Sequence, residues 1–131
     1  MRLFLKAAAA ASFVAVTLAS PAYASLTVNP TLTVANRCGQ SIIFAVRYKT
    51  SSGAWTTSPF IGINGNDTKN NVVSTNNSII YYYAESMSET HKTRWSGDHN
   101  ATIDGKVYAM KRKALTLNAD QNRYRLSLNC N

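Results

Sequence analysis

Apolar and polar residues alternate along most of this chain, whereas helical periodicity is almost absent beyond residue 24. Between residues 26 and 38 the even positions are mostly apolar, and the odd positions carry Thr and Asn. The segments 41–49 and 122–129 alternate in the same way. A strand presents successive side chains to opposite faces, so each segment is expected to bury one face. About eight such short segments, separated by turn residues, predict an all-β fold: a single antiparallel β-sandwich or barrel.

Turn residues and changes of polarity set the expected strand boundaries. Asp104-Gly105 lies between β-prone segments and predicts a tight hairpin turn. Residues 72–73 and 78–86 are expected to be strands, and the polar, aperiodic segment 85–100 is expected to be the longest loop. Residues 107–110 and 114–117 read as two short strands joined by the basic run Lys111-Arg112-Lys113.

The first 24 residues have the order of a secretory signal peptide. Arg2 and Lys6 flank a short apolar start, an apolar stretch follows at 7–18, and Ala22-Tyr23-Ala24 provides small residues for cleavage. The apolar stretch is too short to cross a bilayer as a helix, which takes about 20 residues. We therefore predict a signal peptide over 1–24 and a single β-domain over 25–131, secreted or periplasmic and without a transmembrane segment.

The chain has two cysteines, Cys38 and Cys130, and both are in phase with the apolar face of their expected strands. In an exported protein the simplest state for such a pair is one disulfide. Its closed loop of over ninety residues corresponds to a stabilisation of roughly 4–5 kcal/mol by chain entropy. A redox role is disfavoured because the sequence has no Cys-x-x-Cys motif. We predict a structural bridge from the end of the first strand to the end of the last.

Positive charge is the strongest functional indication in the composition. Without Arg2 and Lys6, the twelve remaining Lys and Arg against six Asp and Glu give a net charge of +6. This favours polyanionic partners such as lipid headgroups, lipopolysaccharide or nucleic acid, although many small secreted domains are basic only for solubility. Arg123 and Arg125 share the outward face of the last strand, and with Lys111-Arg112-Lys113 they are predicted to form one basic patch. The alternative is that these charges only prevent edge-to-edge association of the sheet.

Aromatic residues offer a second binding feature. In the strand containing Tyr81-Tyr82-Tyr83, Tyr81 and Tyr83 face one way and Tyr82 the other. One side is expected to be core, and the sequence leaves open which side faces solvent. We assign Tyr82, together with Trp95, to the binding surface, where the rings can stack on a sugar or a base or lie at a lipid interface.

The segment 85–99 holds the densest cluster of residues capable of catalysis. Glu85, His91, Arg94 and His99 are the types from which a small nuclease-like hydrolase is built. The competing interpretation is a solvated polar loop with two incidental histidines. His91 and His99, with Asp98, do not have the spacing of a metal site. No motif indicates a cofactor, and we predict none.

Several short segments resemble, in order, a family of small bacterial exported proteins catalogued as domain of unknown function 1036. They are Val34-Ala35-Asn36-Arg37-Cys38, Ala45-Val46-Arg47-Tyr48, Trp55, Ile61-Gly62-Ile63, Tyr81-Tyr82-Tyr83-Ala84-Glu85 and Trp95-Ser96-Gly97. The resemblance covers most of Val34 to Gly97 and implies an exported β-domain without a known catalytic centre. The Asn36-Arg37-Cys38 strand is also similar to the start of thaumatin-like proteins.

Together these features favour a small secreted or periplasmic non-enzymatic binding module, for an anionic envelope component or for a protein partner as an inhibitor. The alternative is the nuclease-like hydrolase. The basic residues indicate the kind of partner, and the two interpretations place the site at different residues.

Overall fold

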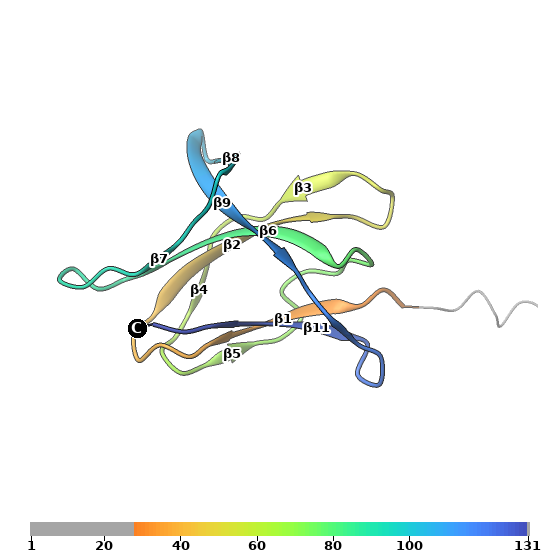
Figure 1. The fold of residues 1–131 in the computed structure, drawn as a ribbon, viewed down its shortest axis with the longest axis horizontal. Coiled ribbons are helices and arrows are strands. Elements are labelled where there is room, and N and C mark those ends of the chain that lie inside the picture. The colour runs from red at the N-terminus through yellow and green to blue at the C-terminus, as the bar shows by residue number, and fades with distance from the viewer. Residues whose placement is uncertain (1–27, 131) are drawn as a thin grey trace, which may run out of the picture.

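The computed structural model describes residues 28–130, and the predicted signal peptide lies outside the described residues. Within them the chain forms eleven β-strands and no helix, so no helix there is long and apolar enough to cross a membrane. The strands form two sheets, which Figure 1 shows as an upper and a lower layer. The predicted all-β fold with one disulfide is confirmed.

The smaller sheet has four strands in the order β10-β11-β1-β5. Its strands are β1 (Thr31–Asn36), β5 (Thr68–Lys69), β10 (Leu117–Asn118) and β11 (Arg123–Leu128). The pair β1–β11 is parallel, and Thr31 lies opposite Arg123. Every other strand pair in the described residues is antiparallel. The first and the last strand of the fold therefore lie side by side and run in the same direction.

The larger sheet has the order β3-β2-β6-β9-β8, with β4 paired to β2 and β7 paired to β6. Its strands are β2 (Ile42–Lys49), β3 (Trp55–Thr57), β4 (Ile61–Ile63), β6 (Ile79–Ser86), β7 (Arg94–Trp95), β8 (His99–Ile103) and β9 (Lys106–Ala114). Figure 1 shows β9 running diagonally from the level of β11 up to β8. The hairpin turn predicted at Asp104-Gly105 is confirmed, and both residues have positive φ, 51° and 80°.

The main core lies between the inner faces of the two sheets. Leu32 and Val34 of β1 and Tyr124, Leu126 and Leu128 of β11 pack against alternate residues of the larger sheet, namely Ile42, Phe44, Val46, Ile80, Tyr82 and Ala84. The Phe44 and Tyr82 rings stack with centroids 5.9 Å apart. The period-2 pattern of the sequence is therefore the inward–outward alternation of these strands.

The parallel pairing of β1 and β11 places their carboxyl ends together, where the disulfide Cys38–Cys130 joins them with a Cα–Cα distance of 5.1 Å. The predicted structural bridge is confirmed. Beside it Asn36, only 1% exposed, points its Nδ2 at the carbonyls of Gln40, Ile63 and Asn64 at 2.9–3.2 Å. Its Oδ1 accepts the Cys38 N–H at 3.0 Å. This buried amide holds the end of β1, the bridge and the end of β4 together.

A second, smaller apolar cluster lies on the outer face of the larger sheet. Ala45 of β2 and Tyr83 of β6 pack there against residues of the β8–β9 hairpin, namely Ala101, Ile103 and Met110. Phe60, Tyr81 and Tyr108 are half-buried around it. The hairpin therefore curls over the outer face, which makes the sheet barrel-like and covers part of it.

Two boundary predictions are wrong. Lys111-Arg112-Lys113 is not a connection but the middle of β9, because residues 111–114 pair with residues 79–82 of β6 and this ladder keeps them extended despite their polarity. Val72-Val73 is not a strand, although its backbone exchanges two hydrogen bonds with Leu32. The expected loop 85–100 is interrupted by β7 and ends where β8 begins at His99.

Candidate functional site

A row of polar and aromatic side chains crosses the outer face of the larger sheet. Thr57 of β3 lies opposite Arg47 of β2, Arg47 opposite Tyr81 of β6, and Tyr81 opposite Arg112 of β9. Directly opposed residues of antiparallel strands project to the same face. Since Tyr82 and Val46 project into the main core, this row projects away from it. Tyr81 thus lies between two arginines from the neighbouring strands.

Two further rings join Tyr81. The His99 imidazole stacks on the Tyr81 ring, with centroids 3.8 Å apart and planes 18° from parallel. The Trp55 ring comes from β3, the strand beyond β2, with its centroid 5.7 Å from that of Tyr81 and its plane tilted by 58°. Trp55 is 37% exposed, and Tyr81 and His99 are half-buried. We call the five residues Arg47, Trp55, Tyr81, His99 and Arg112 the Arg–aromatic surface.

The two arginines carry charge that no carboxylate neutralises in residues 28–130, where the one ion pair joins Lys92 to Glu85. Arg47 Nη1 donates to Thr57 Oγ1 at 2.9 Å, which orients its guanidinium group along the sheet. Arg112 is exposed. The Arg–aromatic surface therefore combines stacked rings with two free cations and contains no acidic side chain.

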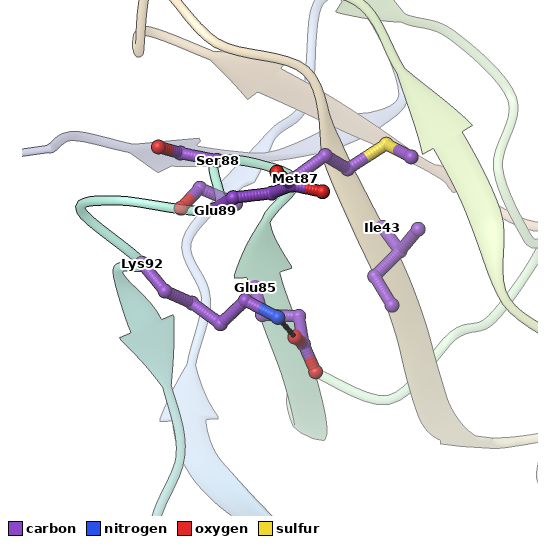
Figure 2. A pocket seen from close by; sticks show the side chains of 7 residues that line it. Ile43, Glu85, Met87, Ser88, Glu89 and Lys92 are labelled. Atoms are coloured by element: carbon purple, nitrogen blue, oxygen red, sulfur yellow. Dashed lines mark ion pairs between the residues drawn. The ribbon is translucent and has the colours of Figure 1, made fainter.

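A pocket lies at the other end of β6. It has a volume of about 470 Å³ and is lined by Ile43, Glu85, Ser86, Met87, Ser88, Glu89 and Lys92. Figure 2 shows Lys92 reaching across to the Glu85 carboxylate, where its Nζ lies 2.8 Å from Oε2. The Tyr83 hydroxyl donates to Oε1 of the same carboxylate at 2.9 Å. Both oxygens of Glu85 are therefore engaged by the protein itself.

These contacts shift two ionisable groups. Burial by itself raises the pKa of Glu85, but the hydrogen bonds from Lys92 and Tyr83 and the charges of Lys92 and Arg94 outweigh it, so the pKa is lowered. Burial, with the hydrogen bond to Glu85, raises the pKa of Tyr83 to about 12. Glu85 is thus an ionised partner of Lys92 at neutral pH and is not poised to give up a proton.

The structure does not bring the four predicted hydrolase residues together. Glu85 and Arg94 are neighbours on β6 and β7. His99, however, stacks on Tyr81, which precedes Glu85 by four residues on β6, or roughly 13 Å along the strand. His91 is on the exposed loop between β6 and β7 and lines a different pocket, of about 420 Å³, beside the disulfide. In the described part of the chain, no three His, Cys, Asp or Glu side chains gather as they do around a metal ion.

The chain matches no family model, and it matches neither a curated protein nor a solved structure. The resemblance to the domain of unknown function 1036 therefore stays a prediction. The function has to be argued from the surface itself.

The predicted basic patch is divided over three surfaces. Arg112 belongs to the Arg–aromatic surface, whereas Lys111 and Lys113 lie opposite Tyr82 and Ile80 and so project to the inner side, where both are exposed at the margin of the core. Arg123 and Arg125 alternate with the buried Tyr124 and Leu126, and therefore project from the outer face of the smaller sheet. A single continuous patch is not formed, because neighbouring residues of one strand project to opposite faces.

The assignment of Tyr82 to the binding surface is wrong, whereas that of Trp95 stays a prediction. Tyr82 is 4% exposed and belongs to the main core, and Trp95, which lies opposite Ala84, packs half-buried against the same core. The outward tyrosines are Tyr81 and Tyr83. The alternation predicts that Tyr81 and Tyr82 face opposite sides, but only the sheet order decides which side is covered. From the sequence, Trp55 is not assigned to a binding surface. Its position after a turn and close to the strand that carries Arg47 is a signal that could have indicated one.

Proposed function

We propose that this protein is a non-enzymatic binding module that recognises an anionic partner through the Arg–aromatic surface. The observation that carries the proposal is the placement of Arg47 and Arg112 on the two strands that flank Tyr81, whose ring stacks with His99, with no carboxylate partner for either arginine in residues 28–130. A guanidinium group offers only donors, in a geometry that matches carboxylate and phosphate. The surface is therefore complementary to an anion.

Binding fits the geometry better than hydrolysis does. General acid–base catalysis needs proton donors and acceptors that converge within hydrogen-bond reach of one reacting atom. His91 and His99 lie on separate surfaces, and the Glu85 carboxylate is occupied by Lys92 and Tyr83. The outer face of the smaller sheet is a weaker candidate, since Arg123 and Arg125 lie opposite Thr31 and Thr33 and have no aromatic neighbour in that register.

The test compares two double variants of equal charge. Arg47→Gln/Arg112→Gln removes the two cations of the Arg–aromatic surface, and Arg123→Gln/Arg125→Gln removes two cations elsewhere. The purified, disulfide-bonded proteins are applied to immobilised heparin, and the salt concentration that elutes each is measured. We expect the first variant to elute at clearly lower salt than the second, because local complementarity and not net charge holds the ligand.

Equal elution of the two variants would show that retention reflects net charge alone, and would refute the proposal. Thermal unfolding of both variants serves as the folding control. Neither pair of arginines is part of the main core, so both variants are expected to unfold near the wild-type temperature.

A further inference from the structure

We infer that the ligand of the Arg–aromatic surface is a single-stranded nucleic acid; this rests on the proposed function and names its ligand class. Proteins that bind single strands without reading a duplex combine aromatic platforms for the bases with cations that follow the phosphates. Both elements occur here in one row of the larger sheet. The inference depends on two features: the stacked rings and the spacing of the cations.

The rings are arranged for flat ligands. His99 already lies face to face on Tyr81, at 3.8 Å and 18°. Trp55 offers a second, partly exposed ring on the opposite flank. Sugars also stack on aromatic rings, but neutral sugars need hydrogen-bond acceptors as well as donors around the ring. Here the flanking groups are guanidinium groups, which only donate. The ligand must therefore be rich in acceptors and anionic, and its flat units must be able to join a ring stack.

The cations are spaced for a backbone that passes over the rings. Arg47 and Arg112 lie on the two strands that flank β6, two strand spacings or roughly 10 Å apart at the backbone. Long arginine side chains on either side of Tyr81 can each hold a phosphate by paired hydrogen bonds, while a base stacks on Trp55, the partly exposed ring beside Tyr81. The outer face thus offers two positions for phosphates and a ring for a base.

The rings favour a single strand over a duplex, because the bases of a duplex are already stacked and paired with one another. The Arg–aromatic surface lies on the sheet itself, and its rings can stack only on bases that are already unpaired. Acidic polysaccharides and anionic lipid surfaces carry charge but no aromatic ring, so they would engage Arg47 and Arg112 without depending on Trp55.

The experiment measures binding of a fluorescein-labelled oligothymidylate of about 12 nucleotides by anisotropy, at several salt concentrations. Trp55→Ala is expected to weaken binding about 5- to 150-fold, the loss typical of one base-stacking ring. Trp55→Phe keeps a ring at the same place, so its affinity should stay within about threefold of wild type. Trp55 lies partly exposed on the edge strand β3, so neither substitution removes core packing.

The charge contacts have a separate signature. Arg47→Gln/Arg112→Gln is expected to reduce the slope of log affinity against log salt by about 0.7 for each phosphate that an arginine no longer neutralises. Trp55→Ala should leave that slope unchanged, since it removes no charge. The matched control, Arg123→Gln/Arg125→Gln, should keep the part of the affinity for the oligonucleotide that comes from stacking on Trp55. A duplex of the same length, heparin and vesicles of anionic lipid are then tested as competitors.

The possible failures are distinguishable. If Arg47→Gln/Arg112→Gln loses heparin and oligonucleotide alike but Trp55→Ala binds the oligonucleotide as wild type does, the nucleic-acid inference is overturned and the binding module stands. The same holds if the duplex, heparin or the vesicles compete better than the single strand. If the double arginine variant binds every polyanion as the Arg123/Arg125 control does, both proposals fail. Degradation of the probe would point to the hydrolase alternative and contradict the proposed function.

Discussion

Removing the Cys38–Cys130 bridge should cost this domain a large share of its stability. The bridge joins residues 92 positions apart. The chain-entropy relation for a loop of that length gives about 15–16 cal/mol/K, or about 4.6 kcal/mol at room temperature. A domain of this size has a free energy of unfolding of about 5–15 kcal/mol. The parallel pairing of β1 with β11 joins the two ends of the fold, so no short connection replaces the bridge.

The measurement is urea unfolding of three forms, followed by tryptophan and tyrosine fluorescence: the oxidised protein, the reduced protein and Cys38→Ala/Cys130→Ala. With slopes of about 1–3 kcal/mol/M in urea, a loss of about 4.6 kcal/mol lowers the midpoint by about 1.5–4.6 M. The reduced protein and the double variant should agree closely, because Cys38 is buried but Cys130 is only half-buried, so replacement by alanine leaves a small gap. A midpoint within about 0.5 M of the oxidised protein would refute this reasoning. Such a result would mean that β1 and β11 associate equally well when the disulfide does not join their ends.

Three further predictions concern stability. Asn36→Ala removes the amide that faces three carbonyls and the Cys38 N–H, so we expect a loss of about 3 kcal/mol in chemical unfolding; an unchanged midpoint would contradict the role of this amide. The lowered pKa of Glu85 means that its ionised form stabilises the fold above the pKa of the unfolded state, and that this stabilisation is lost as pH falls through the folded pKa. The difference in melting temperature between wild type and Glu85→Gln should therefore shrink on acidification, and a constant difference would contradict it. In Gly97→Ala the new Cβ would lie 2.7 Å from the Met110 carbonyl oxygen and 2.8 Å from the Lys111 Cα, so we expect a loss of about 1–3 kcal/mol, whereas Gly62→Ala, with no atom within 4 Å, should melt as wild type does.

The fold class and the disulfide could be predicted because both depend on local patterns. The alternation at 42–49 and 123–128 is the direct trace of strands buried on one face. Two cysteines allow only one internal pairing, whatever the topology. Asp104-Gly105 marks its hairpin because few residues tolerate positive φ at both turn positions. These features need no knowledge of which strands are neighbours.

The candidate site could not be predicted because it depends on strand order. Arg47, Tyr81 and Arg112 are far apart in the sequence and meet only because β2 and β9 both pair with β6. The basic residues of β9 lie in a strand, although their polarity is typical of a loop, because their backbone pairs with β6 while their side chains stay exposed. The assignment of Tyr82 to the solvent side is wrong because it, too, depends on how the strands and sheets are arranged. Alternation separates the two faces, but only the packing of the second sheet shows which face is covered.

The larger sheet is stabilised on both faces, and this is what makes its outer surface suitable for recognition. Tyr82 anchors β6 in the main core from one side, while Tyr83 packs against Met110 and the β8–β9 hairpin from the other. That hairpin also carries His99, so the packing that completes the second cluster holds the imidazole on Tyr81. Arg47 is oriented by Thr57. The Tyr81 and His99 rings and the Arg47 guanidinium group are already held by neighbouring side chains, so the protein would lose little conformational entropy there on binding a ligand. The three consecutive tyrosines thus divide their roles between the two faces: Tyr82 and Tyr83 pack in the two apolar clusters, and Tyr81 holds the His99 and Trp55 rings of the proposed binding surface.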